Sequence, residues 1–342
     1  MKKPSYFSSD FKDNEINLET IKRIGKKQVL EALYLMVLIR HFEIRGESAY
    51  QQGLIGGFYH AYSGQEAIQT AAVQVFGKEN WYVTSYRCHA LPLLLGVTPH
   101  ELMAELYGRL TGNAKGRGGS MHFYTNRMLG GAAIVGGHLP IAIGAAFSIK
   151  YQNKNNELSV CFLGEGAVAQ GAFHESLNLA SLWDLPVIFI IENNQWGMGT
   201  HASRALCCSE AIAEKQGPSY NINSYKLNGM NYFDCYQGFR SIYQECLKTG
   251  RPVLIECLCE RLKGHSISDP GLYRTKTDLE AIKKKDPIVF LKNHLKKCDL
   301  LTEEEFEILN KKAKDTILES MTYAENSPWP SPAGLEQDVY AP

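Results

Sequence analysis

The sequence predicts an α/β fold with a mostly parallel sheet, helices on both faces of the sheet, and a C-terminal helical segment. Two short apolar runs, 159–163 and 187–191, lack polar alternation, which is typical of strands covered on both faces. Between them, Phe173, Leu177 and Ala180 stand near helical spacing. A connection of this length indicates a crossover between parallel strands. Strand, helix and strand therefore form the centre of the predicted fold.

Polar residues that could bind a ligand follow both predicted strands. Glu165 follows the first, and we expect the helix to open at Gly166 and Ala167, which places backbone N–H groups and the positive end of the helix dipole beside a carboxylate. Asn194 follows the second, at the edge where open α/β sheets bind ligands. Carboxylate, amide and carbonyl oxygens suit Mg²⁺, which often completes its shell with phosphates. The pattern predicts a site for Mg²⁺ and a diphosphate.

The remaining elements follow from apolar spacing, caps and chain breakers. We expect a scaffold helix over 27–52 that ends at Gly53, and a short strand that ends at Tyr86 and Arg87. Later elements, in order, are a helix over 140–150, a strand within 221–228, a helix over 232–247 before Gly250, and a strand over 252–259. The helical segment at the C-terminus completes the order.

Capping-box spacing marks the start of three helices. The pairs are Ser63 with Glu66, Thr98 with Glu101, and Thr302 with Glu305. A fourth start is predicted where Asp286 precedes Pro287, because an acidic cap followed by proline favours the first helical turn. We divide the chain into an arm over residues 1–24, an α/β domain over 25–300, and a C-terminal helix with an extended tail over 301–342.

Composition excludes several classes of function. Lys plus Arg and Asp plus Glu both number 36, so the zero net charge provides no bulk attraction to nucleic acid or to a membrane surface. The longest apolar run, 32–39, is too short to span a bilayer. Nine cysteines without a CxxC pair indicate thiols of a reducing compartment, and the N-terminal residues have no apolar export segment. We expect a soluble cytoplasmic protein.

Five sequence blocks carry a specific resemblance. The GEG and ENNQWGMG motifs of the central stretch are accompanied, in order, by SYRCHALPLLLGV, LYGRLTGNAKGRGGSMHFY, GGAAIVGGHLPIAIGAA and KGHSISDPGLYRTK. Together they resemble the thiamine diphosphate-dependent 2-oxo acid dehydrogenases, and within them the alpha subunits of the first component of pyruvate dehydrogenase. The resemblance extends from about Leu30 to the tail. It implies the thiamine diphosphate-binding fold.

The resemblance also implies roles for residues at matching positions. The implied Mg²⁺ ligands are Glu165, Asn194 and the backbone carbonyl of Trp196. His60 and His265 would face the substrate and the reacting carbon. The residues implied to bind the cofactor are Tyr86, Arg87, Ala133, Val135, Glu165, Gly166, Ala167, Asn194, Trp196 and His265.

Two positions near the metal depart from the family pattern. Glu165 replaces the usual aspartate, and Ala169 stands where many members have asparagine. The longer side chain shifts the carboxylate, and Mg²⁺ accepts displaced ligands poorly. We expect the site to survive with a backbone adjustment. The same departures support an alternative of another class, a non-catalytic assembly subunit that has lost its cofactor.

The chain has no identifiable glutamate to activate the cofactor, and this bears on its expected partners. Thiamine enzymes use a glutamate to activate the cofactor, and we assign Glu66 no such role because its capping position explains it. The resemblance implies that a beta subunit supplies this group, that the two chains form an α₂β₂ heterotetramer, and that the acyl group passes to the lipoyl group of dihydrolipoyl acetyltransferase. Relatives in animals are phosphorylated at the position of Ser266, but a deletion between Pro270 and Tyr273 removes a second serine, so we do not expect kinase control.

Three further alternatives concern the reaction. Branched-chain 2-oxo acid dehydrogenase and acetoin dehydrogenase belong to the same enzyme class, and selection by side-chain length is worth only about 1–3 kcal/mol per methylene. The HSISDPGLYRT segment resembles the pyruvate enzyme more than either. A nicotinamide-dependent Rossmann dehydrogenase is rejected, because no GxGxxG motif with a downstream ribose-binding acid occurs.

Overall fold

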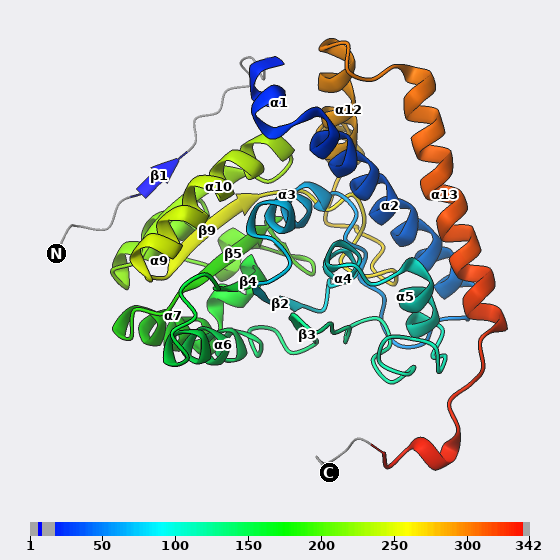
Figure 1. Cartoon of the computed structure of the whole chain (residues 1–342), viewed down its shortest axis with the longest axis horizontal. Helices are drawn as coiled ribbons and strands as arrows, with labels where there is room; N and C mark the ends of the chain where they lie inside the picture. Colours follow the sequence, from blue (N-terminus) through cyan, green and yellow to red (C-terminus); the bar gives the residue numbers. More distant parts are fainter. Residues whose placement is uncertain (1–5, 9–17, 338–342) are drawn as a thin grey trace.

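The computed structural model describes residues 6–8 and 18–337 and contains one large parallel sheet (Figure 1). Its seven strands are β1 (Tyr6–Ser8), β8 (Asn223–Asn228), β9 (Val253–Leu258), β5 (Val187–Asn193), β4 (Ser159–Gly164), β2 (Trp81–Ser85) and β3 (Met128–Ala132), in spatial order. A small hairpin pairs β6 (Trp196–Gly197) with β7 (Thr200–His201). The predicted fold class is confirmed.

Helices cover both faces of the sheet. On one face lie α6 (Leu139–Tyr151), α7 (Gly171–Leu182) and α9 (Ile212–Ser219). On the other side, one apolar core joins the sheet to α2 (Lys26–Gln51), α3 (Glu66–Phe76), α4 (Ala90–Leu95), α5 (Pro99–Leu106), α10 (Tyr232–Thr249) and α12 (Pro287–Lys297), and α13 (Glu303–Asn326) packs on α2 and α5. The remaining α-helices are α1 (Leu18–Ile24), α8 (Ala202–Ala205) and α11 (Lys276–Lys284). Figure 1 shows α13 running beside α2 at the edge of the molecule.

Alternation along the central strands divides the core into two. Val160 and Phe162 of β4 face the core beneath α2, α3 and α10. Cys161 and Leu163 of the same strand face the core beneath α6 and α7. Since successive side chains of a strand point to opposite faces, a continuous apolar run is what a strand with two covered faces requires. This explains why the central strands show no polar alternation.

Most expected boundaries agree closely with the structure. Thr98 and Thr302 form complete capping boxes, and the Asp286 side chain accepts a hydrogen bond from the N–H of Ile288. Helix α10 ends at Gly250, which is in the left-handed conformation that glycine favours. The predicted division into arm, domain and tail stays a prediction, and its residues 1–5, 9–17 and 338–342 lie outside the described residues.

The capping box predicted for Ser63 and Glu66 is wrong. Gln65 precedes α3, and its side chain makes no capping hydrogen bond. The Glu66 carboxylate instead binds the guanidinium of Arg40, at 2.5 and 3.0 Å, and accepts the N–H of Gly64. A buried arginine offers this carboxylate a charged donor, which is stronger than a neutral backbone donor.

The helix start predicted at Gly166 and Ala167 is also wrong. These residues lie in a 3-10 turn, η1 (Glu165–Ala169), and α7 begins only at Gly171. Gln170 between them is extended, with φ −82° and ψ 141°, so the two helical pieces are separate. Glu165 therefore lies at the start of a tight turn and not at the end of an α-helix.

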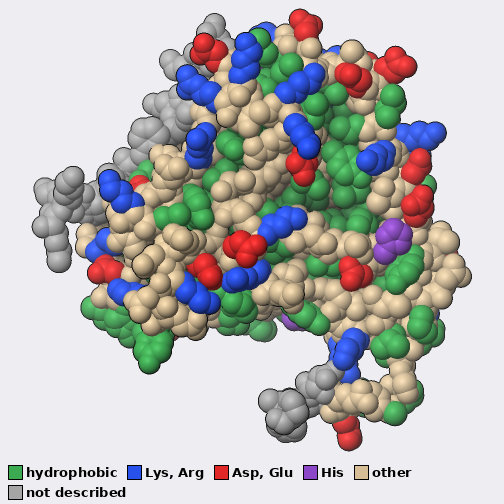
Figure 2. All heavy atoms as spheres, viewed as in Figure 1, with side chains coloured by type: hydrophobic (Ala, Val, Ile, Leu, Met, Phe, Trp, Pro, Cys, Tyr) green, Lys and Arg blue, Asp and Glu red, His purple; other side chains and the backbone are tan. Residues whose placement is uncertain are grey.

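The surface carries no single-sign field on the face shown in Figure 2, where Lys and Arg side chains are mixed with Asp and Glu. This agrees with the zero net charge. Among the described residues, no helix combines the length and apolar character needed to cross a bilayer.

Thr302→Ala should lower the free energy of unfolding by about 1 kcal/mol, because it removes the acceptor for the N–H of Glu305 at the start of α13. For a chain of this size that corresponds to a midpoint lowered by about 1–2 °C, measured by scanning calorimetry. Thr322→Ala in the same helix is the matched control, since Thr322 is exposed and alanine favours helix. An equal fall in the control would contradict the capping role.

Candidate functional site

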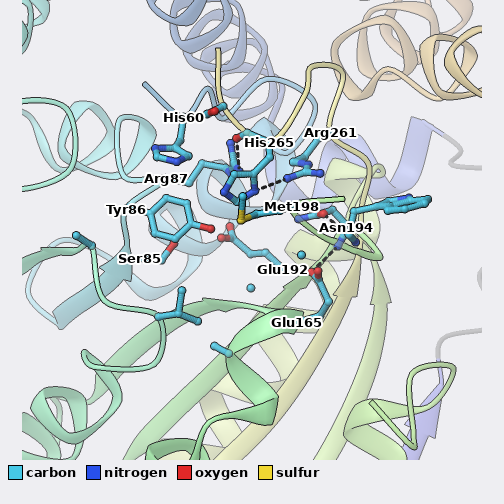
Figure 3. A pocket seen from close by; sticks show the side chains of 18 of the residues that line it. His60, Ser85, Tyr86, Arg87, Glu165, Glu192, Asn194, Met198, Arg261 and His265 are labelled. Carbon is cyan, nitrogen blue, oxygen red and sulfur yellow. Dashed lines mark hydrogen bonds between the residues drawn. The ribbon is translucent and has the colours of Figure 1, made fainter. Parts of the chain in front are cut away.

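A cavity of about 590 Å³ opens at the carboxyl edge of the parallel sheet (Figure 3). Its walls come from the segments that follow β2, β4, β5 and β9, from the loop before α3, and from the turn before α6. Every site residue predicted from the sequence lines it, namely His60, Tyr86, Arg87, Ala133, Val135, Glu165, Gly166, Ala167, Asn194, Trp196 and His265. The fold thus gathers residues from six separate stretches of chain.

The register of β4 and β5 brings Glu165 and Asn194 together. Gly164 lies opposite Glu192, so the residues that follow the two strands emerge side by side. The N–H of Asn194 donates to Oε2 of Glu165 at 3.2 Å. The two adjacent asparagines diverge, because Asn193 donates to Glu256 on the neighbouring strand β9. Only Asn194 faces the cavity.

Glu165 is a buried carboxylate without a cation partner. It is 2% exposed, and no Lys or Arg of the described chain forms an ion pair with it. Burial raises the pKa of Glu165, while backbone hydrogen bonds and the positive charges of Arg261 and Arg87 oppose the rise. A buried charge is expensive unless it is compensated, so this carboxylate suits a bound cation.

The donor set beside Glu165 fits Mg²⁺ rather than a softer metal. The predicted ligands are one carboxylate, the amide oxygen of Asn194 and a backbone carbonyl, and Asn194 Oδ1 also accepts the N–H of Trp196 at 3.3 Å. A carbonyl-type oxygen has a second lone pair for a metal. No cluster of three His, Cys, Asp or Glu occurs in the described residues, which argues against a zinc-type site there.

Two buried guanidinium groups line the same cavity. Arg87 donates to the carbonyl oxygens of Ala61 and His265, at 2.6 and 3.0 Å. Arg261 is 1% exposed and donates to Nδ1 of His265 at 3.0 Å and to the hydroxyl of Tyr273 at 3.1 Å. Burial and repulsion from Arg87 lower the pKa of Arg261 to about 10. Since neither arginine has a carboxylate partner within the described chain, the pair suits a polyanion such as a diphosphate.

Two histidines lie on the same side of the cavity as these arginines, with Glu165 below them in Figure 3. The rings of His60 and His265 are 5.1 Å apart and nearly perpendicular, and the His60 ring lies 4.5 Å from Tyr86. Burial, then the charge of Arg87, lowers the pKa of His60 to about 3 and that of His265 to about 4. Both rings are therefore neutral at neutral pH. Because Arg261 can only donate, the proton of the neutral His265 ring is on Nε2.

The comparisons with known proteins agree with this geometry. Residues 34–333 match the family model described as dehydrogenase E1 component. The chain belongs to this dehydrogenase E1 family.

Curated members of the E1 family match along nearly the whole chain. The pyruvate dehydrogenase E1 component subunit alpha of Rickettsia bellii is 39% identical over 317 residues, which cover 92% of this chain and 96% of that protein. The protein of the same name from Rhizobium meliloti is 36% identical over 94% of this chain and 92% of its own. The chloroplastic pyruvate dehydrogenase E1 component subunit alpha-3 of Oryza sativa is 33% identical, over 93% of this chain and 77% of its own.

Arg261 and Glu192 line the E1 cavity, but sequence reasoning assigned them no role. Glu192 accepts hydrogen bonds from the hydroxyl of Tyr62 and, at 3.2 Å, from the amide of Gln69. Burial raises the pKa of Glu192 to about 7 against these contacts and the charge of Arg87. The sequence could have indicated both residues, because each is a charged residue at or just after the carboxyl end of a buried strand, where ligands bind. The other lining residues are Phe58, Gln65, Ser85, Met121, Gly136, His138, Gly164, Gln170, Gly197, Met198 and Ser266.

The histidines of the E1 cavity make stability depend on pH in a defined direction. Their folded pKa values lie below the ordinary value of 6.5, so between these values the unfolded chain binds more protons. This contribution to stability is complete above about pH 6.5 and is lost progressively toward about pH 4 for His265 and about pH 3 for His60. We expect His60→Gln to make the fall shallower, as measured by denaturant unfolding across this range.

The matched control for that measurement is His122→Gln, since His122 is exposed and lies outside the cavity. Its profile should follow that of the unmodified chain. Identical slopes for His60→Gln and the unmodified chain would show that His60 does not titrate as its surroundings require.

Proposed function

We propose that this chain is the alpha subunit of the pyruvate dehydrogenase first component. With a beta subunit it carries out the thiamine diphosphate- and Mg²⁺-dependent oxidative decarboxylation of pyruvate and the reductive acetylation of the lipoyl group of dihydrolipoyl acetyltransferase. The observation that carries the proposal is the contact between Glu165 and Asn194 in a cavity that also holds two unpaired buried arginines. The relatives' name, pyruvate dehydrogenase E1 component subunit alpha, supports the choice of pyruvate as substrate.

The chain's own residues suit each part of the cofactor. Glu165, Asn194 and the carbonyl of Trp196 would ligate Mg²⁺, and Arg87 with Tyr86 would bind the diphosphate. Arg261 extends this set, since it is buried and lines the same wall. Backbone groups of Ala133 and Val135, which line the same cavity, would hold the aminopyrimidine ring. Bound thiamine diphosphate supplies the carbon nucleophile and the electron sink for decarboxylation.

The two histidines suit proton handling near the substrate. His265 has its proton on Nε2, because Nδ1 accepts from Arg261. His60 has a buried Nδ1 without a hydrogen-bond partner in the described chain, and such a group is available to a ligand. Lowered pKa values keep both rings neutral at physiological pH, where neutral imidazole accepts a proton and also donates one.

Several features support a beta subunit at the mouth of the cavity and an α₂β₂ heterotetramer. Phe58 and Met198 line the cavity yet are 60% and 64% exposed. The carboxylates that line it are Glu165 and Glu192, and each is already bound within the chain. Glu66 does not line the cavity, so it is no candidate for the activating glutamate. A partner chain would cover the apolar rim and supply that group.

The proposed compartment is the cytoplasm, as expected from the cysteine pattern. All nine cysteines are free, and six of them are buried. Burial raises the pKa of Cys161 well above its ordinary value, which keeps this thiol protonated and unreactive. Ser266 lines the cavity, and the expectation that it is not a target of kinase control stays a prediction.

Calorimetry on the co-purified alpha and beta chains tests the proposal. Thiamine diphosphate should bind only with Mg²⁺, and Glu165→Ala should weaken that binding by about 100-fold or more, equivalent to about 3 kcal/mol. Glu175→Gln is the matched control, since Glu175 is an exposed carboxylate on the following helix α7. Failure of the unmodified pair to bind the cofactor would favour a non-catalytic assembly subunit.

Turnover by the same pair should favour pyruvate over 2-oxoisovalerate, measured as carbon dioxide release with a lipoyl acceptor. The purified alpha chain alone should release none above background, because it lacks the activating carboxylate. Preference for 2-oxoisovalerate would place the protein with the branched-chain enzymes. Full activity of the alpha chain alone would disprove the division of labour between the subunits.

A further inference from the structure

A second cluster of buried polar side chains lies behind the cavity. It consists of Glu43 on α2, Tyr59 in the loop before α3, His89 at the start of α4, and Ser120. Glu43 and His89 are both 0% exposed, and neither lines the cavity. The proposed reaction uses none of these residues.

Hydrogen bonds define the charge of this cluster. Nδ1 of His89 lies 3.0 Å from each carboxylate oxygen of Glu43, and Nε2 lies 2.9 Å from the carbonyl oxygen of Ser120. Equal distances are typical of an N–H that points between two carboxylate oxygens. A carbonyl oxygen only accepts, so Nε2 carries a proton as well. These distances fit the geometry of an imidazolium ion paired with the Glu43 carboxylate.

The side chains in closest contact with the pair are aromatic. The rings of Phe42 and Phe123 lie 6.0 and 5.7 Å from the His89 ring, and Tyr59 lies at 4.8 Å. Tyr59 donates to Oε2 of Glu43 at 2.7 Å. Burial and the neighbouring Glu43 raise the pKa of Tyr59, so its hydroxyl stays protonated and donates.

The other titratable groups that face the cluster come from three elements. Glu47 lies on α2 beyond Glu43, His60 follows Tyr59, and Cys88 precedes His89. Burial raises the pKa of Cys88 to about 12, so this thiol is neutral. The Lys263 ammonium neutralises Glu47 in an ion pair of 2.7 Å. Glu43 is therefore the counter-charge in direct contact with His89.

The cluster joins the segments that carry the cavity's functional residues. Tyr59 directly precedes His60, and His89 follows Arg87 by two residues. The Ser120 hydroxyl donates to the carbonyl of Phe58, which lines the cavity. The scaffold helix α2 is held close to this loop at Gly46, where a Cβ would lie 2.1 Å from the Tyr59 hydroxyl oxygen. Glu43 on α2 therefore contacts two segments: His89 links it to the segment that carries Arg87, and Tyr59 links it to the loop that carries His60.

We propose that His89 and Glu43 form a positioning pair that holds the His60 loop and the Tyr86–Arg87 turn in register for cofactor and substrate. This inference rests on the proposed function for the identity of the cofactor. It assigns no chemical step to either residue. A buried ion pair contributes little net stability compared with an apolar substitute, but it specifies geometry because each charge tolerates one partner.

The experiment uses the alpha and beta chains purified together and compares three variants. Glu43→Gln and His89→Gln each leave one buried charge unpaired, and the double variant replaces the pair with two neutral amides. We expect each single variant to lower the unfolding midpoint more than the double variant does. We expect the double variant still to bind thiamine diphosphate about 10- to 100-fold more weakly, because the walls are no longer positioned.

Asp286→Asn provides the matched control. Asp286 forms a part-buried ion pair with Arg40 at 2.7 Å on the same helix α2, but it does not line the cavity. This control should lower the unfolding midpoint and leave cofactor affinity unchanged. Unchanged affinity in the folded double variant would overturn the proposal, because the pair would then be structural only.

Two measurements do not depend on the cofactor. Nuclear magnetic resonance of ring-labelled histidine should show a signal with both nitrogens protonated near neutral pH, and His89→Gln should remove it. Hydrogen exchange followed by mass spectrometry should show faster exchange over 58–61 and 86–89 in the double variant but not in Asp286→Asn. A neutral His89 ring, or unchanged exchange in both segments, would overturn the proposal.

These readouts separate this inference from the proposed function. If the unmodified alpha and beta chains together failed to bind thiamine diphosphate, the proposed function would be wrong. The charge of the His89 ring and the exchange rates would still decide the role of His89. Should the charge variants fail to fold, Tyr59→Phe removes one hydrogen bond from Glu43 and no charge. It should accelerate exchange over 58–61, and normal exchange there would count against the proposal.

Discussion

The parallel register of β4 and β5 is the constraint on which the candidate site depends. Gly164 pairs with Glu192 across the two strands, so Glu165 and Asn194 emerge together at one edge. A slip of one residue would turn Val160 and Phe162 from one core into the other, and both cores are closely filled. The apolar packing of two helical layers therefore holds a metal-type ligand pair in place.

The buried charges in the cavity favour the binding of charged ligands at a cost to the stability of the folded chain. Two carboxylates, Glu165 and Glu192, and two guanidinium groups, Arg87 and Arg261, are all buried there, and none forms a direct ion pair with another. Such an arrangement is unfavourable in an empty protein, because desolvation of each charge is only partly offset. A bound cation would compensate the carboxylates, and a bound polyanion would compensate the guanidinium groups. Perturbed pKa values concentrate at this site for the same physical reason.

Outside the cavity, buried charges are paired within the chain and connect helix α2 to other elements. Arg40 binds Glu66 and Asp286 and connects α2 to the starts of α3 and α12, away from the cavity. His89 and Glu43 form a similar connection from the same helix toward the cavity walls. Besides the Glu47–Lys263 ion pair, helix α2 therefore makes charged contacts both to the scaffold, through Arg40, and toward the site, through Glu43. Both lie beneath a continuous apolar core.

Errors in the sequence interpretation arose where distant contacts or local backbone conformation overrode a pattern of short spacing. Ser63 and Glu66 have the spacing of a capping box, but Arg40, distant in sequence, provides a stronger partner for the carboxylate. Gly166 and Ala167 form a 3-10 turn because extended Gln170 ends it before α7 begins. Arg261 received no role because its position beside His265 depends on how the loop after β9 folds back.

Local pattern by itself predicted β2, β4, β5, β8 and β9, most of the long helices, three of the four caps and the meeting of Glu165 with Asn194, whereas the other site residues followed from the family resemblance. Those features depend on near neighbours in sequence, so spacing and residue type predict them. Tertiary structure alone decided which charges meet: Arg40 with Glu66, Glu43 with His89, and Arg261 with His265. Each pair is chosen by the approach of distant segments in a medium where an uncompensated charge is unfavourable, and one-dimensional spacing contains no measure of that approach.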